Sequence, residues 1–253
     1  REIVRLLRKR DAVETVFEQA FCERSLQAVL ERLWLTGEIF SRKPEVENEL
    51  ENLSYYLKQV FPVVFNNLDD RLRHAWELVW PEAKPLLDKE LPTLSFASWV
   101  GGDRDGHPKV TAKVTRNTLR TLTQGAEEVV RSRLVELGQK LAFSRTGLAA
   151  PPALLARLKN WEIPEDIGEP WKVFVLCIAE HLDEGIEPLR ENLELLISSL
   201  VKAGAILTVD LYVRPVLRLI NSFGLHLARL DVRQNSDAYD LALGQMMEAA
   251  GID

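Results

Sequence analysis

The sequence predicts a mainly helical protein that contains two or three short strands. Apolar residues recur every three to four positions through most of the 253 residues, which is the spacing of amphipathic helices. Two short segments, Leu94–Val100 and Leu225–Arg233, depart from that spacing and predict strands. Hydrophobic residues make up 46% and charged residues 28% of the chain, which is typical of a folded globular protein.

The helical spacing occurs in segments that glycine, proline or polar residues separate. Thr111 precedes the longest of these segments and suits the N-cap position. Pro215 either kinks the helix that contains it or marks a late start of that helix. The expected helices cover residues 3–20, 26–34, 46–61, 72–79, 111–143, 152–161, 170–183, 186–203 and 208–222, with a last helix from about 236.

The two strand segments differ in character. Leu94–Val100 is rich in serine and aromatic residues and ends at Gly101, which favours a buried strand followed by a loop. In Leu225–Arg233 the residue types alternate, so that charged residues gather on one face. The members of that face are Leu227, Arg229, Asp231 and Arg233.

We expect residues 1–253 to form a single helical segment of a longer protein. Residues 145–170 contain several prolines and form a loose excursion between helices, but no shift in composition marks a linker there. The chain begins at Arg1 within a helical pattern and without an initiator methionine, which favours a piece of something larger.

Charge and composition argue against several classes of function. A net charge of −6 is unusual for a protein that binds nucleic-acid phosphates. The apolar run Val173–Ala179 is far shorter than the ~20 residues of a membrane span. The four histidines lack metal-ligand spacing and no Cys-x-x-Cys pair occurs, so we expect no metal site within this chain. Two cysteines far apart favour a reducing cytoplasm, although a disulfide between them stays open.

A charged, glycine-rich loop follows the first expected strand. Its glycines permit unusual backbone angles and close approach of a ligand. Its arginine can bind an anion through two N–H groups, but a turn whose Asp and Arg satisfy one another is an equally good interpretation. The candidate anion-binding residues are Gly101, Gly102, Asp103, Arg104 and Asp105, with Trp99 in support.

The charged face of the second strand is the other candidate site. A solvated edge strand is the commoner explanation of such a face, yet a strand between helices usually has both faces covered. Covered charges need partners, and Asp231 could then hold Arg229. Arg233, at the carboxyl end, would be free to bind an anionic ligand.

Two motifs resemble signatures of the phosphoenolpyruvate carboxylase family. Residues 96–111 read FASWVGGDRDGHPKVT, where the family usually shows Ser/Thr-Trp-Met-Gly-Gly-Asp-Arg-Asp-Gly-Asn-Pro. Residues 223–236 read FGLHLARLDVRQNS and resemble the family's Leu-Asp-Ile-Arg-Gln-Glu-Ser landmark. Thr36–Ile39 followed by Lys43-Pro44 resembles a weaker third landmark. The departures are Val100, His107, Asn235 and Ala238-Tyr239.

The resemblance implies a fold and a reaction. It implies a helix-rich fragment of an incomplete α/β barrel, from the N-terminal half of a much larger, allosteric, cytoplasmic lyase. That enzyme would carboxylate phosphoenolpyruvate with bicarbonate to give oxaloacetate and phosphate, with Mg²⁺ or Mn²⁺ bound by ligands outside this chain. Arg233 would grip the phosphate, and Arg104 would belong to a substrate or effector anion site.

The resemblance also implies partners that complete the enzyme. These are the remaining C-terminal part of the protein and further copies of it in a homo-oligomer, with a tetramer expected. The family's catalytic His-Pro-Thr-Glu stretch and its metal-binding carboxylates do not occur in these residues, so we expect the isolated chain to be inactive. The alternative is a non-catalytic helical binding or scaffold domain that keeps the anion-binding loops.

Overall fold

The computed structural model describes residues 2–13, 15–36, 45–86, 90–105, 108–143, 150–164 and 168–252. Most of the third motif, residues 37–44, lies outside this part, as do Gly106 and His107 of the glycine loop. The chain divides into two compact units, Arg1–Glu45 and Val46–Asp253. The prediction that residues 1–253 form a single segment of a larger enzyme stays a prediction.

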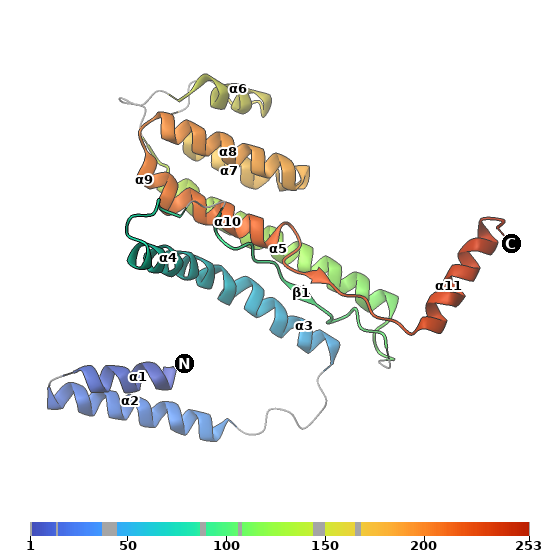
Figure 1. Cartoon of the computed structure of the whole chain (residues 1–253), viewed down its shortest axis with the longest axis horizontal. Coiled ribbons are helices and arrows are strands. Elements are labelled where there is room, and N and C mark those ends of the chain that lie inside the picture. The colour runs from blue at the N-terminus through green and yellow to red at the C-terminus, as the bar shows by residue number, and fades with distance from the viewer. Residues whose placement is uncertain are drawn as a thin grey trace. The chain divides into compact units, whose positions relative to one another are not determined.

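The first unit is a pair of packed helices, α1 (Glu2–Ala12) and α2 (Val16–Leu35) (Figure 1). The break between them falls inside the helix expected over residues 3–20, so that boundary was wrong. Its cause is Thr15, whose hydroxyl accepts a hydrogen bond from the Glu18 amide at 3.2 Å and starts a new helix. An ion pair of 2.7 Å between Arg32 and Glu2 joins the two helices.

Proline placement explains two irregular helical stretches in the second unit. The helices α3 (Val46–Tyr55) and α4 (Phe61–Val79) are joined by a π-helical turn, η1 (Tyr56–Val60), just before Pro62. The same arrangement precedes Pro215, where η4 (Val209–Val213) joins α9 (Ile206–Thr208) to α10 (Arg214–Phe223). Proline lacks an N–H and its ring collides with the carbonyl four residues earlier, which the wider π turn relieves.

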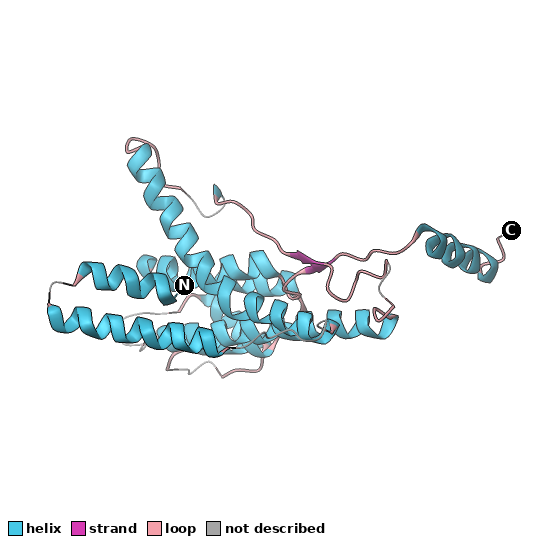
Figure 2. Ribbon diagram, turned by 90° about the horizontal axis from the view of Figure 1, so that it is seen from below, coloured by secondary structure: helices cyan, strands magenta, loops and turns pink. Residues whose placement is uncertain are grey.

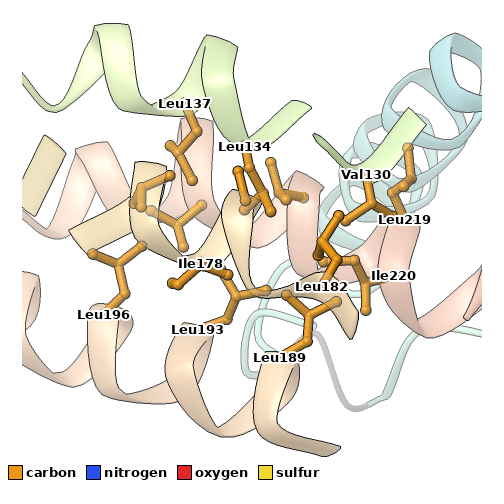
Figure 3. Close-up of a cluster of buried hydrophobic side chains, with 14 of the residues drawn as sticks. Val130, Leu134, Leu137, Ile178, Leu182, Leu189, Leu193, Leu196, Leu219 and Ile220 are labelled. Carbon is orange, nitrogen blue, oxygen red and sulfur yellow. The ribbon is translucent and has the colours of Figure 1, made fainter. Parts of the chain in front are cut away.

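The remaining helices build the main hydrophobic core. Leucine, isoleucine and valine side chains from α5, α7, α8 and α10 point toward one another there (Figure 3). Trp171 is fully buried in the same core, and its indole N–H donates to the Ser199 hydroxyl at 2.7 Å. The core contains residues of α5 (Ala112–Lys140), α6 (Pro152–Asn160), α7 (Pro170–Glu180), the 3₁₀ turn η3 (Leu182–Glu184) and α8 (Ile186–Lys202), whereas α11 (Ser236–Ala249) has no buried residue.

The prediction of a mainly helical chain with a few short strands is confirmed. Thr111 caps α5 as expected, accepting a hydrogen bond from the Val114 amide. Gly224 ends α10 with a positive φ of 58°, a backbone angle that glycine adopts without strain. Within the described residues, no helix has both the length and the apolar character that crossing a bilayer would need.

The two strands form a small parallel sheet of β1 (Ala97–Ser98) and β2 (Arg229–Leu230). Figure 2 shows them as short arrows within long connecting loops. Both strands are shorter than expected. The second starts late because Leu227 adopts a left-handed φ of 54°, which interrupts an extended backbone. That conformation places the Leu227 side chain in the core, where it is 1% exposed.

Candidate anion-binding site

The two sequence motifs meet at the parallel sheet. The Arg229 amide donates to the Phe96 carbonyl at 2.8 Å, and the Asp231 amide donates to the Ser98 carbonyl at 2.8 Å. Beyond the strands, Asp103 and Arg233 form an isolated parallel bridge. The carboxyl ends of both strands therefore lie together, which is where ligands bind in α/β folds.

The glycine loop is hydrogen-bonded to the end of the second strand through backbone atoms. The Arg233 amide donates to the Gly102 carbonyl at 3.0 Å, and the Arg104 amide donates to the Arg233 carbonyl at 2.9 Å. The position of the Arg233 backbone is thus set by the conformation of residues 102–104.

Two glycines are required for this close approach. A Cβ at Gly102 would lie 2.3 Å from the Asp231 carbonyl oxygen, which belongs to the backbone of the neighbouring strand. A Cβ at Gly101 would lie 2.1 Å from the Thr118 hydroxyl, and Gly101 has a φ of 77°. A side chain at either position would therefore separate the loop from its neighbours.

The side chain of Arg104 reaches the first turns of α5. One guanidinium N–H, Nη2, donates to the Thr115 hydroxyl at 2.9 Å, and that hydroxyl donates to the Gly101 carbonyl at 2.8 Å. The Arg104 Nε is buried and has no hydrogen-bond partner in the described part of the chain.

Arg233 is placed differently. Three charged residues occupy every second position of this segment and are exposed: Arg229, Asp231 and Arg233. Among the described residues, none of these three side chains forms a hydrogen bond or an ion pair. The ion pair considered between Asp231 and Arg229 is therefore not formed among the described residues, and both side chains are exposed. Arg233 lies just beyond the carboxyl end of β2, in the bridge with Asp103, and no described group binds its guanidinium.

The other predicted residues shape the loop. The Trp99 carbonyl accepts hydrogen bonds from the amides of Gly102 and Asp103 at 2.8 and 3.0 Å, while its indole ring is 59% exposed. The Asp103 carboxylate accepts a hydrogen bond from the Asp105 amide at 3.2 Å, so part of the acidic cluster satisfies the turn itself.

Sequence reasoning missed Thr115, which connects Arg104, Gly101 and α5. Its spacing was the available signal: Thr115 follows the N-cap Thr111 by one helical turn, so both hydroxyls lie on the side of α5 that meets the loop.

The described residues offer no cluster of three His, Cys, Asp or Glu side chains that could hold a metal ion.

Comparison with known proteins agrees with this architecture. The family model described as phosphoenolpyruvate carboxylase matches residues 1–173 and 177–253. A phosphoenolpyruvate carboxylase of Bradyrhizobium diazoefficiens is 31% identical over 98% of this chain and 29% of its own length. Those of Paraburkholderia xenovorans and Azoarcus sp. are 27% and 30% identical over 100% and 98% of this chain.

The chain spans less than a third of the length of these curated relatives, since it covers 28% to 30% of each. The family match, in contrast, includes both motifs and the helices between them. The chain belongs to the phosphoenolpyruvate carboxylase family.

Proposed function

We propose that this chain is part of a phosphoenolpyruvate carboxylase, a lyase that converts phosphoenolpyruvate and bicarbonate into oxaloacetate and phosphate. The family match over nearly the whole chain supports the proposal. One structural observation supports a specific residue: Arg233, just beyond the carboxyl end of β2, is exposed and has no partner among the described residues, and its backbone is hydrogen-bonded to the glycine loop.

Arg233 is suited to the first chemical step. In that step a bicarbonate oxygen attacks phosphorus, the bond from phosphorus to the enol oxygen breaks, and carboxyphosphate and the enolate of pyruvate form. Carboxyphosphate then yields CO₂ and phosphate, and the enolate carbon attacks CO₂. A guanidinium at the phosphate would bind two of its oxygens and stabilise charge during transfer. Mg²⁺ or Mn²⁺, bound outside this chain, would supply further positive charge.

The test is steady-state kinetics of Arg233→Lys in the full-length protein. Lysine keeps the positive charge and loses the two-point contact. Because the contact strengthens as the phosphoryl group moves, kcat should fall, by roughly 10²–10³. Arg116→Lys is the control, since Arg116 is an exposed arginine of α5 whose guanidinium also has no partner among the described residues. Equal kcat/KM for phosphoenolpyruvate in the two variants would remove Arg233 from the site.

The second candidate is a non-catalytic helical domain that keeps the loops. Oxaloacetate formation by the full-length protein, but not by the isolated chain, is the result that we expect. An inactive full-length protein that still binds inorganic phosphate would favour the binding domain instead. Assembly as a homo-oligomer, a cytoplasmic location and effector binding near Arg104 are further parts of the proposal.

A further inference from the structure

We propose that Thr115 is a positioning residue for Arg233, acting through the glycine loop. This inference depends on the proposed function, because it assigns Arg233 to the substrate phosphate. Thr115 is buried and, among the described residues, forms no hydrogen bond with Arg233 or with β2. It would act by fixing the loop that in turn fixes the Arg233 backbone.

Each link of this chain is a hydrogen bond between described atoms. The Thr115 hydroxyl accepts from Arg104 Nη2 at 2.9 Å and has the Gly101 carbonyl at 2.8 Å as the nearer of two acceptors, the other being the Thr111 carbonyl at 3.2 Å. The next residue, Gly102, accepts from the Arg233 amide at 3.0 Å, and the Arg104 amide donates to the Arg233 carbonyl at 2.9 Å. The Thr115 hydroxyl therefore anchors both Gly101, which precedes Gly102, and Arg104, and it is Gly102 and Arg104 that bind the Arg233 backbone.

The location of Thr115 makes the anchor stiff. Thr115 is 9% exposed and lies near the start of a helix of 29 residues whose side chains fill the main core. Residues 101–105 of the loop are two glycines and three charged residues, so they bring no large apolar side chain of their own into the core. The Thr115 hydroxyl, on a rigid helix, links these residues to the helical core.

The same helix provides a matched control. Thr118 is also a buried threonine of α5 beside Gly101, at 1% exposure, but its hydroxyl has no hydrogen-bond partner in the described part of the chain. Valine at either position keeps the branched shape and replaces the hydroxyl with a methyl group, so the ability to form a hydrogen bond is lost. Loss of the hydroxyl should therefore matter at Thr115 and not at Thr118.

The experiment compares Thr115→Val, Thr115→Ser and Thr118→Val in the full-length protein. Two measurements are made: steady-state kinetics with phosphoenolpyruvate, and amide hydrogen exchange of peptides that contain Arg104 and Arg233. Thr115→Val should lower kcat by about tenfold to hundredfold, because small misplacements of a binding group have effects of this size. KM should change less than kcat. The amides of Arg104 and Arg233 should exchange faster.

Thr115→Ser should restore both measurements, because serine keeps the hydroxyl, and Thr118→Val should behave as wild type. Exchange and kcat equal in Thr115→Val and Thr118→Val would overturn the inference. Faster exchange with unchanged kcat would also overturn it, leaving Thr115 as a support of the loop alone. A wild-type protein without carboxylase activity would defeat the proposed function, and the exchange data would still decide whether Thr115 holds the Arg233 backbone.

Discussion

Replacement of Gly102 by alanine tests whether the close approach of the two motifs matters for activity. The new Cβ would lie 2.3 Å from the Asp231 carbonyl oxygen, whereas ordinary contacts begin at 3.4 Å. The oxygen is a backbone atom and the position of the Cβ is fixed by the backbone of residue 102, so no side-chain rotation relieves the collision. The loop and the strand must separate by about 1 Å.

That separation is enough to break the hydrogen bonds beside it. The Arg233 amide lies 3.0 Å from the Gly102 carbonyl, and the Arg104 amide lies 2.9 Å from the Arg233 carbonyl. Each lost backbone hydrogen bond costs about 0.5–1.5 kcal/mol, so two cost about 1–3 kcal/mol of local stability. A displacement of Arg233 by about 1 Å should lower kcat/KM by about 10².

The assay is kcat/KM for phosphoenolpyruvate in the full-length protein, with far-UV circular dichroism as a check on the helices. Gly244→Ala is the control, since Gly244 lies in α11 and a Cβ there meets nothing within 4 Å. The helical signal should stay unchanged in both variants. The reasoning is refuted if Gly102→Ala retains the kcat/KM of Gly244→Ala.

Two further predictions concern the helical core. Arg218→Met should destabilise the protein by about 3–5 kcal/mol, measured by denaturant unfolding, because it leaves the Asp69 carboxylate buried at 9% side-chain exposure without its partner at 2.9 Å. Combining it with Asp69→Leu should recover most of that loss, and additive losses would contradict the explanation. Burial, and secondarily Glu180, raises the pKa of the Cys177 thiol. The thiol of the unfolded chain ionises at a lower pH than the buried thiol, so ionisation favours the unfolded state. The Tm difference between wild type and Cys177→Ala should therefore narrow as the pH rises above about 8.5. A constant difference would count against a buried thiol.

Helices were predictable because their signals are local. Periodic apolar residues mark each core-facing stripe, and Thr111 and Gly224 mark ends through their own backbone and side-chain chemistry. The response to proline was not predictable. A kink and a late start both remained open at Pro215, and the structure instead keeps the helix continuous through a π turn. Two residues of that turn, Val209 and Val213, are fully buried in the core.

The length of the second strand could not be predicted from the alternation of residue types, because Leu227 departs from the extended backbone while its side chain is buried in the core. Leu227 adopts a left-handed conformation that costs roughly 1–2 kcal/mol. Its side chain fills a space beside Gly125 of α5, where a Cβ would lie 2.8 Å from Leu227 Cδ1. Burial of a leucine side chain is worth about 1.5–3 kcal/mol, which offsets the strain. Neither the backbone strain nor the free energy of burial can be predicted from the sequence, because both depend on the contact between α5 and the segment that contains Leu227.

At the candidate site, too, the residue types could be predicted from local sequence, whereas the side-chain contacts depend on residues that are far apart in the sequence. From the sequence, Arg104 and Arg233 were both plausible anion-binding residues. The parallel pairing joins their backbones, but the Arg104 guanidinium binds Thr115 of α5 while the Arg233 side chain is exposed. A phosphate at the strand ends would therefore meet Arg233 directly and Arg104 only through the loop that it stabilises. The difference between the two arginines depends on the register of the two strands and on Thr115. It can therefore be recognised only from the structure, in which the two motifs are paired.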